Sequence, residues 1–249
     1  MFSRGVLGQP CAGAILEPPY LPAMWSAMTL LHALPRLIAA IALTIGLSLP
    51  GCPRAEDFTL IVLGDSLSAG FGLENPDTLV ERIEAGLAEA GLAIDAINAG
   101  VSGDTAAQGR ARFNWSVGPD ADGVLIELGA NDMFAGRDPA AVKADLAAMI
   151  EAARDRGLWV GLVGMRAPRN AGPEYRTAFD GLYPELSVEY DVPLYPFYFD
   201  GLIDGETGAR EDDLFLRDGI HPTTEGVTIV ADRLSAWLAN NLPRAEGDA

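Results

Sequence analysis

From Phe58 onward the sequence alternates short apolar runs with longer segments of helical periodicity, and this alternation constrains the fold most. Three of the runs end at a glycine, and all five have the length of a strand, at 58–64, 93–99, 123–129, 158–164 and 192–197. Short, continuous apolar runs bounded by turn residues are typical of strands buried on both faces. The sequence therefore predicts one five-stranded parallel sheet covered by helices on both sides.

The segments between these runs carry helix signals, at 78–90, 105–116, 138–157, 173–190 and a last helix that begins after residue 222. Asp138-Pro139 is a capping side chain followed by proline at the first helical position. Pro184 predicts a kink. No linker interrupts the pattern, so residues 56–243 are expected to form one α/β domain.

The first 52 residues are expected to lie outside this domain. Arg36 precedes the apolar run "LIAAIALTIGLSLP", which is too short to span a bilayer comfortably and is typical of a secretory signal peptide. A buried core helix is the alternative. The sequence "LPGC" resembles a bacterial lipobox, in which Cys52 would be lipidated, and cleavage after Ala55 is the competing reading. We therefore expect export, to the periplasm or to a lipid-anchored position on the envelope.

Charge and cysteine content exclude several classes of function. The formal net charge is −18, and such a field repels phosphate backbones and anionic lipids, so a nucleic-acid partner is not expected. Both cysteines, Cys11 and Cys52, precede the predicted domain, which leaves no cysteine nucleophile or cysteine-based metal site within it. With only two histidines in the chain, a zinc site is not expected, and neither is another cofactor.

Small and polar residues follow the first three predicted strands. "GDSLSAG" occupies 64–70, "NAGVSGDT" occupies 98–105, and "GAND" occupies 129–132, while "DGIH" closes the late irregular stretch at 218–221. The carboxyl ends of parallel strands meet at one edge of a sheet, which is where α/β folds bind their ligands. The sequence therefore predicts that these segments form one site.

These segments contain the groups that nucleophilic catalysis needs. A serine hydroxyl requires a base, a carboxylate that orients the base, and donors for the oxyanion. Ser66 supplies the hydroxyl, His221 the base and Asp218 the carboxylate. The backbone N–H groups of Ser66 and Gly103 and the side chain of Asn131 supply the donors.

Each of these residues also has a purely structural reading. Ser66 suits a helix cap, Gly103 a positive φ angle, and Asn131 an Asn-Asp turn. Asp218 and His221 suit a solvated turn. Of the neighbouring residues, Asp65 is expected to fix its own turn and Ser68 to bond locally.

Taken together, the four segments resemble the blocks of the GDSL/SGNH hydrolases, whose marker residues are serine, glycine, asparagine and histidine. Ala130 stands where that family often has glycine. The resemblance covers about residues 57–240 and is strongest to the branch of bacterial periplasmic thioesterases, lysophospholipases and arylesterases. It implies a flavodoxin-like three-layer α/β/α sandwich, and an acyl-enzyme on Ser66 within a Ser66–His221–Asp218 triad.

We therefore expect a serine hydrolase that cleaves small-molecule carboxylic esters or thioesters. The alternatives are a carbohydrate O-acetylesterase on the same scaffold, a catalytically idle envelope binding protein and a structural lipoprotein. The acyl group is expected to contact loops after the third and fourth strands, through Met133, Phe134, Arg166, Ala167 and Pro168. Ordinary loop packing is the other reading of these five. No insertion is available as a lid, so an open groove is expected, and no obligate protein partner is evident.

Overall fold

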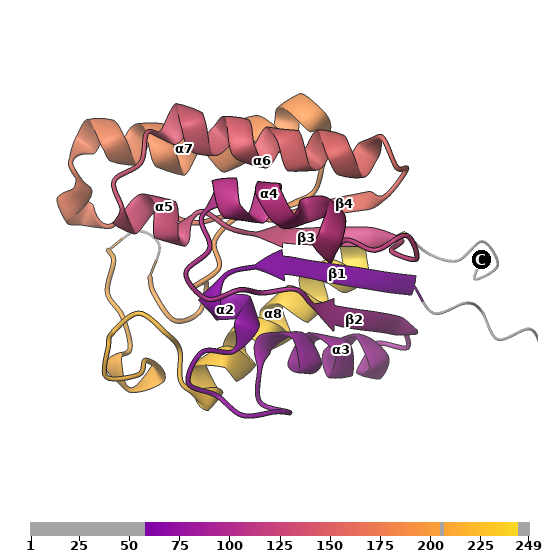
Figure 1. Ribbon diagram of the computed structural model, residues 1–249. Helices are drawn as coiled ribbons and strands as arrows, with labels where there is room; N and C mark the ends of the chain where they lie inside the picture. Colours follow the sequence, from indigo (N-terminus) through magenta and orange to yellow (C-terminus); the bar gives the residue numbers. More distant parts are fainter. Residues whose placement is uncertain (1–57, 205–206, 244–249) are drawn as a thin grey trace, which may run out of the picture. The chain divides into compact units, whose positions relative to one another are not determined.

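A computed structural model describes residues 58–204 and 207–243, and its centre is a five-stranded sheet (Figure 1). The strand order is β2-β1-β3-β4-β5, and every pair is parallel. The strands are β1 (Phe58–Gly64), β2 (Ile94–Asn98), β3 (Gly123–Glu127), β4 (Trp159–Val163) and β5 (Leu194–Tyr195). This is the order of flavodoxin-like folds, and it confirms the predicted architecture.

Helices cover both faces of the sheet, as Figure 1 shows. On one side lie α3 (Leu79–Glu89) and α8 (Thr224–Asn241), which pack against each other. The other side carries α4 (Ala106–Ser116), α6 (Pro139–Arg154) and α7 (Pro173–Tyr190). The three-layer sandwich is thus confirmed, and α7 continues through Pro184. The predicted signal peptide, the lipobox and the domain start at residue 56 lie outside the described residues.

The core is built on the central strands. Every residue of β3 is buried, and so are the last five residues of β1. The strand β2 differs, because it forms one edge of the sheet and its residues are exposed or half-buried. Among the described residues, no helix combines the length and apolar character needed to cross a membrane.

Two short helices follow strands directly and were not predicted, namely α2 (Ser66–Ala69) and α5 (Ala130–Phe134). A single turn is too short to show helical periodicity. The last strand is shorter than predicted, because β5 covers only two residues of 192–197. Pro193 and Pro196 flank it, and neither has an N–H to donate to a neighbouring strand. The irregular stretch that follows contains the 3₁₀ turn η2 (Asp212–Leu214), and another, η1 (Arg169–Ala171), precedes α7.

Candidate active site

Ser66 is the first residue of α2, directly beyond the carboxyl end of β1. The Asp65 side chain caps this helix by accepting a hydrogen bond from the Leu67 N–H at 3.0 Å. The helix ends after one turn at Gly70, whose φ of 78° suits glycine. Asp65 therefore fixes the turn as predicted, and the turn presents the Ser66 hydroxyl at the edge of the sheet.

The loop after β2 packs directly on α2. The Asn98 side-chain N–H donates to the Ser68 carbonyl at 2.8 Å, and the Gly100 N–H donates to the Asn98 side-chain oxygen at 2.9 Å. A Cβ on Gly100 would lie 2.4 Å from the backbone nitrogen of Ala69, so this close approach requires glycine. Gly103, in the same loop, lines the same cavity as Ser66.

His221 lies between Ser66 and Asp218, although 155 residues separate it from Ser66. Its Nε2 is 2.8 Å from Ser66 Oγ, and its Nδ1 is 2.8 Å from Asp218 Oδ2. An ionised carboxylate only accepts hydrogen bonds, so it favours the tautomer with the proton on Nδ1. In that tautomer, Nε2 is free to accept the serine proton.

The carboxylate of Asp218 is held in its ionised form. Its Oδ1 accepts hydrogen bonds from the N–H groups of Ile220 at 2.8 Å and His221 at 3.0 Å. The Ile220 N–H and the contacts with His221 lower the pKa of Asp218 to about 2. Asp218 therefore stays negatively charged at every pH where an enzyme of this kind is assayed.

This charge state predicts the effect of a mutation. Asp218→Asn should lower kcat by about three to four orders of magnitude, because it removes the charge that orients His221. An Asn variant within a few-fold of the parent would show that Asp218 only caps its turn.

The three expected oxyanion donors converge at this point. Among the described residues, neither the Ser66 N–H nor the Gly103 N–H has a hydrogen-bond acceptor. The Asn131 side-chain nitrogen donates to Asp65 Oδ2 at 2.9 Å and to the Asp104 carbonyl at 3.0 Å. Asn131 therefore bridges two loops, and an oxyanion bound at this point would have to share one of these amide hydrogens.

We expect Asn131→Ala to lower kcat by roughly two to three orders of magnitude, the usual effect of losing one oxyanion donor. Steady-state kinetics on a soluble ester would measure this. Because the same amide bonds to Asp65 and Asp104, thermal unfolding should be recorded in parallel. A variant that unfolds earlier but keeps kcat within about twofold would assign Asn131 to the loops alone.

A buried carboxyl group lies beneath α2, the short helix that begins at Ser66. Glu127, at the end of β3, is fully buried, and its Oε2 is 2.7 Å from Ser68 Oγ. The expectation that Ser68 bonds locally is therefore wrong, because its partner lies on a strand distant in sequence. Burial raises the pKa of Glu127 well above its ordinary value, and it raises the pKa of Asp65 to about 6. The uncharged side chain of Glu127 therefore links α2 to the central strand β3 through its hydrogen bond with Ser68.

The raised pKa of Glu127 predicts a pH-dependent gain in stability for Glu127→Gln. The folded protein holds the Glu127 proton where the unfolded chain has lost it, so this group stabilises less as pH rises above about 4.5. Glutamine has the same shape and does not ionise. The unfolding midpoint of Glu127→Gln should therefore exceed that of the parent by more at pH 8 than at pH 5. Glu185→Gln, on an exposed carboxyl, serves as the control, and equal behaviour of the two variants would contradict a buried neutral Glu127.

An arginine that the sequence analysis missed joins the first two loops. Arg112 on α4 contacts Asp104 Oδ2 through Nε at 2.6 Å and donates to the Gly64 carbonyl through Nη2 at 3.0 Å. Its position on a helix gave no signal, because an arginine there is ordinarily a surface residue. Buried Asp132 also connects two segments of the site. It accepts a hydrogen bond from the Ala106 N–H at 2.7 Å and so fixes the start of α4.

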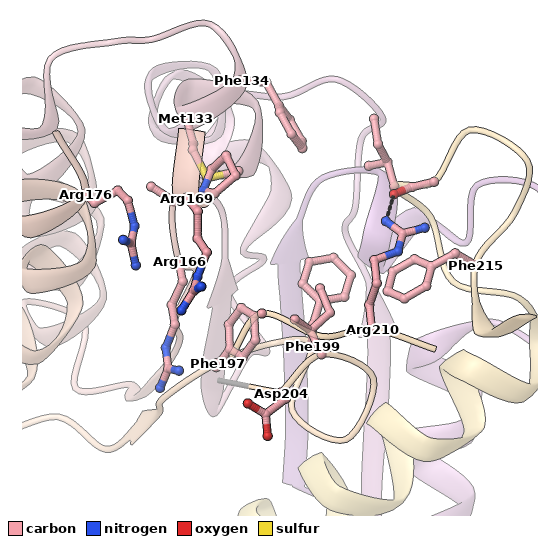
Figure 2. Close-up of a pocket in the computed structure, with 16 residues that line it drawn as sticks. Met133, Phe134, Arg166, Arg169, Arg176, Phe197, Phe199, Asp204, Arg210 and Phe215 are labelled. Atoms are coloured by element: carbon pink, nitrogen blue, oxygen red, sulfur yellow. Dashed lines mark hydrogen bonds between the residues drawn. The ribbon is translucent and has the colours of Figure 1, made fainter. Parts of the chain in front are cut away.

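Ser66 lines one cavity, and a second cavity of about 390 Å³, shown in Figure 2, shares several of its lining residues. Of the five residues expected to bind the acyl group, Met133, Phe134 and Arg166 line both cavities, and Ala167 and Pro168 line the second. Phe134 is 57% exposed, which argues against simple loop packing.

Aromatic residues of the site were missed. The Phe71 ring lies 4.3 Å from the His221 ring, and Phe197, Phe199 and Phe215 line the second cavity. The run "YPFYF" at 195–199 was the available signal for Phe197 and Phe199, but the sequence analysis used its first three residues only as the end of a strand at 192–197.

Comparison with known proteins agrees with this geometry. Residues 62–229 match the model of the GDSL-like lipase/acylhydrolase family. The chain belongs to this family. Its resemblance to GDSL/SGNH hydrolases is thereby confirmed, over a segment that contains Ser66, Gly103, Asn131, Asp218 and His221.

Individual members of the GDSL family are similar over most of their length. "Esterase TesA" of Pseudomonas aeruginosa is 38% identical over 170 residues, covering 68% of this chain and 82% of that protein. "Thioesterase 1/protease 1/lysophospholipase L1" of Escherichia coli K12 is 33% identical, covering 74% and 83%. The crystal structure of AlinE4, an SGNH-hydrolase family esterase, matches with a TM-score of 0.62 at 36% identity, covering 77% of this chain and all of that one.

Proposed function

We propose that this GDSL-family protein hydrolyses carboxylic esters or thioesters through an acyl-enzyme on Ser66. The contacts that carry this proposal are Ser66 Oγ to His221 Nε2 and His221 Nδ1 to Asp218 Oδ2, both 2.8 Å. A nucleophile, a base and an orienting carboxylate in hydrogen-bonded sequence are the arrangement that activates a serine hydroxyl. Relatives named esterase, thioesterase and lysophospholipase support the same reaction class.

The reaction proceeds in two halves. Ser66 Oγ attacks the carbonyl carbon while His221 Nε2 accepts its proton, and the charge of Asp218 stabilises the imidazolium. The N–H groups of Ser66 and Gly103, with the Asn131 side chain, bind the oxyanion. The tetrahedral intermediate collapses as His221 gives its proton to the leaving alcohol or thiol. Water, activated by the same imidazole, then attacks the acyl-enzyme and releases the acid.

The acyl portion of the substrate is assigned to the cavities beside Ser66. Met133, Phe134 and Arg166 line the route from the hydroxyl, and Ala167 and Pro168 lie further along it. The second cavity, of about 390 Å³, also has the rings of Phe197, Phe199 and Phe215 in its wall. This volume exceeds what an acetyl group fills. The cavity therefore favours longer acyl chains over the O-acetylesterase alternative.

A substrate panel tests the proposed function. p-Nitrophenyl esters from acetate to decanoate, matching acyl-CoA thioesters, lysophospholipids and an O-acetylated sugar would be compared by kcat/KM. We expect the medium-chain esters or thioesters to exceed the acetates. A fluorophosphonate probe should label the protein covalently. Absence of both hydrolysis and labelling would support the idle binding protein, and a preference for the O-acetylated sugar would overturn the chain-length argument.

We also propose that the protein is exported. This proposal rests on the sequence pattern between Arg36 and Cys52. Expression of the full chain in a bacterial host, followed by fractionation and mass determination of the mature N-terminus, tests the proposal. A lipid-modified start at Cys52, abolished by Cys52→Ala, would identify an envelope anchor. An uncleaved chain in the cytoplasmic fraction would contradict export.

A further inference from the structure

The aromatic side chain that contacts the base lies on a tight turn directly after α2. Phe71 stands between Gly70 and Gly72, whose φ angles of 78° and 79° lie in the left-handed region. Two left-handed residues on either side of one side chain reverse the backbone sharply, and glycine adopts this conformation without strain. The turn "AGFGL" at 69–73 therefore presents a single large ring at a fixed place beside the site.

This turn contacts both the segment of the nucleophile and the segment of the base. The Phe71 N–H donates to the Ser66 carbonyl at 3.0 Å. On the other side, a Cβ on Gly72 would lie 2.7 Å from Leu216 Cδ1, so the two residues pack closely. The Leu216 N–H in turn donates to the His221 carbonyl at 2.7 Å. The backbone thus holds the Phe71 ring in register with both reacting side chains.

The Phe71 ring covers one face of the His221 imidazole. The two ring centroids lie 4.3 Å apart, and the ring planes make an angle of 33°. This arrangement is closer to face over face than to edge to face. The His221 side chain is only 15% exposed, whereas Phe71 is 49% exposed and lines the Ser66 cavity. Phe71 therefore stands between the base and solvent at the mouth of that cavity.

The hydrogen bonds of His221 restrain its ring in one direction only. They lie at its two nitrogens, toward Ser66 Oγ and Asp218 Oδ2, and so act in the plane of the ring. A ring packed on the face acts perpendicular to that plane. Phe71 supplies this second restraint, which the triad itself lacks.

The same contact favours the charged form of the base. The face of an aromatic ring attracts a positive charge that lies within about 6 Å of its centroid. The His221 imidazolium forms only as the proton leaves Ser66, during the attack on the carbonyl. An interaction that strengthens in the transition state raises kcat, whereas one that is equally strong before it changes KM.

We propose that Phe71 is a positioning residue for the base: its ring fixes the plane of the His221 imidazole and stabilises the imidazolium that forms as Ser66 attacks. This inference rests on the proposed hydrolase function and adds a residue outside the triad and the oxyanion donors. Because Phe71 lines the Ser66 cavity, the competing role is contact with the acyl group alone. The two roles predict different kinetics.

Four variants separate these roles. Phe71→Leu keeps an apolar side chain but removes the ring, and Phe71→Tyr keeps the ring. Phe134→Leu is the contrast, because Phe134 lines both cavities and makes no ring contact with His221 among the described residues. Trp115→Leu is the control, since it removes a ring on α4 that is 84% exposed and lines neither cavity.

The kinetic test compares p-nitrophenyl acetate with p-nitrophenyl octanoate. We expect Phe71→Leu to lower kcat by about fivefold on both esters, the usual effect of losing one contact between a cation and an aromatic ring at a partly exposed site. The KM values should stay close to those of the parent. Phe71→Tyr should retain most of the parental kcat, and Trp115→Leu all of it. Phe134→Leu should instead raise KM, and more for the octanoate.

A covalent inhibitor without an acyl chain isolates the activation of the serine. Diisopropyl fluorophosphate reacts with an activated serine hydroxyl and carries no long chain for the cavities to bind. Its second-order rate constant with Phe71→Leu should fall by the same factor of about five, because the base assists this reaction too. Phe134→Leu should react with it at nearly the parental rate.

The NMR signals of the imidazole report the ring contact without any turnover. The chain has two histidines, so a histidine-labelled His32→Ala protein shows the signals of His221 alone. Protons that lie over an aromatic face are shifted upfield by its ring current. In that background Phe71→Leu should move the His221 ring-proton signals downfield, and Phe71→Tyr should leave them near their parental positions. Thermal unfolding of each variant, recorded in parallel, should show that the fold is retained.

Three results overturn the inference while leaving the proposed function intact. The first is a Phe71→Leu variant with the parental kcat on both esters and the parental rate with diisopropyl fluorophosphate. The second is a loss confined to KM and to the octanoate, which would assign Phe71 to acyl binding. The third is an equal loss of kcat in Phe71→Leu and Phe71→Tyr, because tyrosine keeps the ring. A parent that reacts with neither ester nor with diisopropyl fluorophosphate overturns the proposed function instead.

Discussion

Ser66→Ala is expected to reduce kcat by about five to six orders of magnitude, as loss of the nucleophile does in other serine hydrolases. No other hydroxyl lies 2.8 Å from the His221 imidazole among the described residues. The fold should survive, because the hydrogen bond of Ser66 Oγ among the described residues is with His221 and alanine suits the first turn of α2. The measurements are ester hydrolysis, fluorophosphonate labelling and thermal unfolding of the same preparation.

Ser68→Ala is the matched control for this change. It removes an identical hydroxyl from the same helix, but that hydroxyl bonds to Glu127 and not to His221. We expect the Ser68 variant to unfold at a lower temperature, because a buried partner is left unpaired, and to keep its covalent labelling. If Ser66→Ala retains labelling and the Ser68 variant loses it, the nucleophile has been assigned to the wrong serine.

His221→Ala is expected to lower kcat by a similar five to six orders of magnitude, since a triad works as one unit. Without a base the Ser66 hydroxyl keeps its proton and remains a weak nucleophile. The double variant Ser66→Ala/His221→Ala should therefore be no slower than either single variant. Additive losses would show that the two residues act independently, which contradicts the proposed mechanism.

Chemical modification gives a second test of His221. The chain has two histidines, so a His32→Ala protein contains a single imidazole. Diethylpyrocarbonate should then inactivate by modifying one residue, and a substrate-analogue acid should slow the reaction, because His221 lies in the wall of the Ser66 cavity. Full activity after stoichiometric modification would show that the "DGIH" segment is only a turn and that His221 is not the base.

Much of this fold could be predicted from residue pattern because the strands are short, apolar and bounded by turn residues. The expected strand at 58–64 matches β1, and the helix expected at 173–190 matches α7. The pattern failed where one or two residues decide the structure. The strand β5 is much shorter than expected because a proline flanks it on each side. The helices α2 and α5 are too short to show a helical period.

The residues of the candidate site were also identified from the sequence, because their blocks follow strands whose carboxyl ends share one edge. The contacts that hold these residues in place were not identified from the sequence. The partner of Ser68 was expected nearby and is Glu127, and the bonds of Arg112 to Gly64 and Asp104 had no local signal. Such contacts depend on which strands become neighbours, which a short motif does not encode.

By itself, therefore, the sequence determined the parallel α/β class and predicted a candidate set of site residues, since periodicity and short motifs are local properties. That set is Ser66, Gly103, Asn131, Asp218 and His221. Tertiary structure alone decided that His221 lies 2.8 Å from a serine 155 residues away, and that Glu127 is buried beneath it. It also decided that the Phe71 ring lies 4.3 Å from the His221 ring. Distances, burial and local charge arise only when packing brings distant segments together, and these quantities set pKa values and ligand preference.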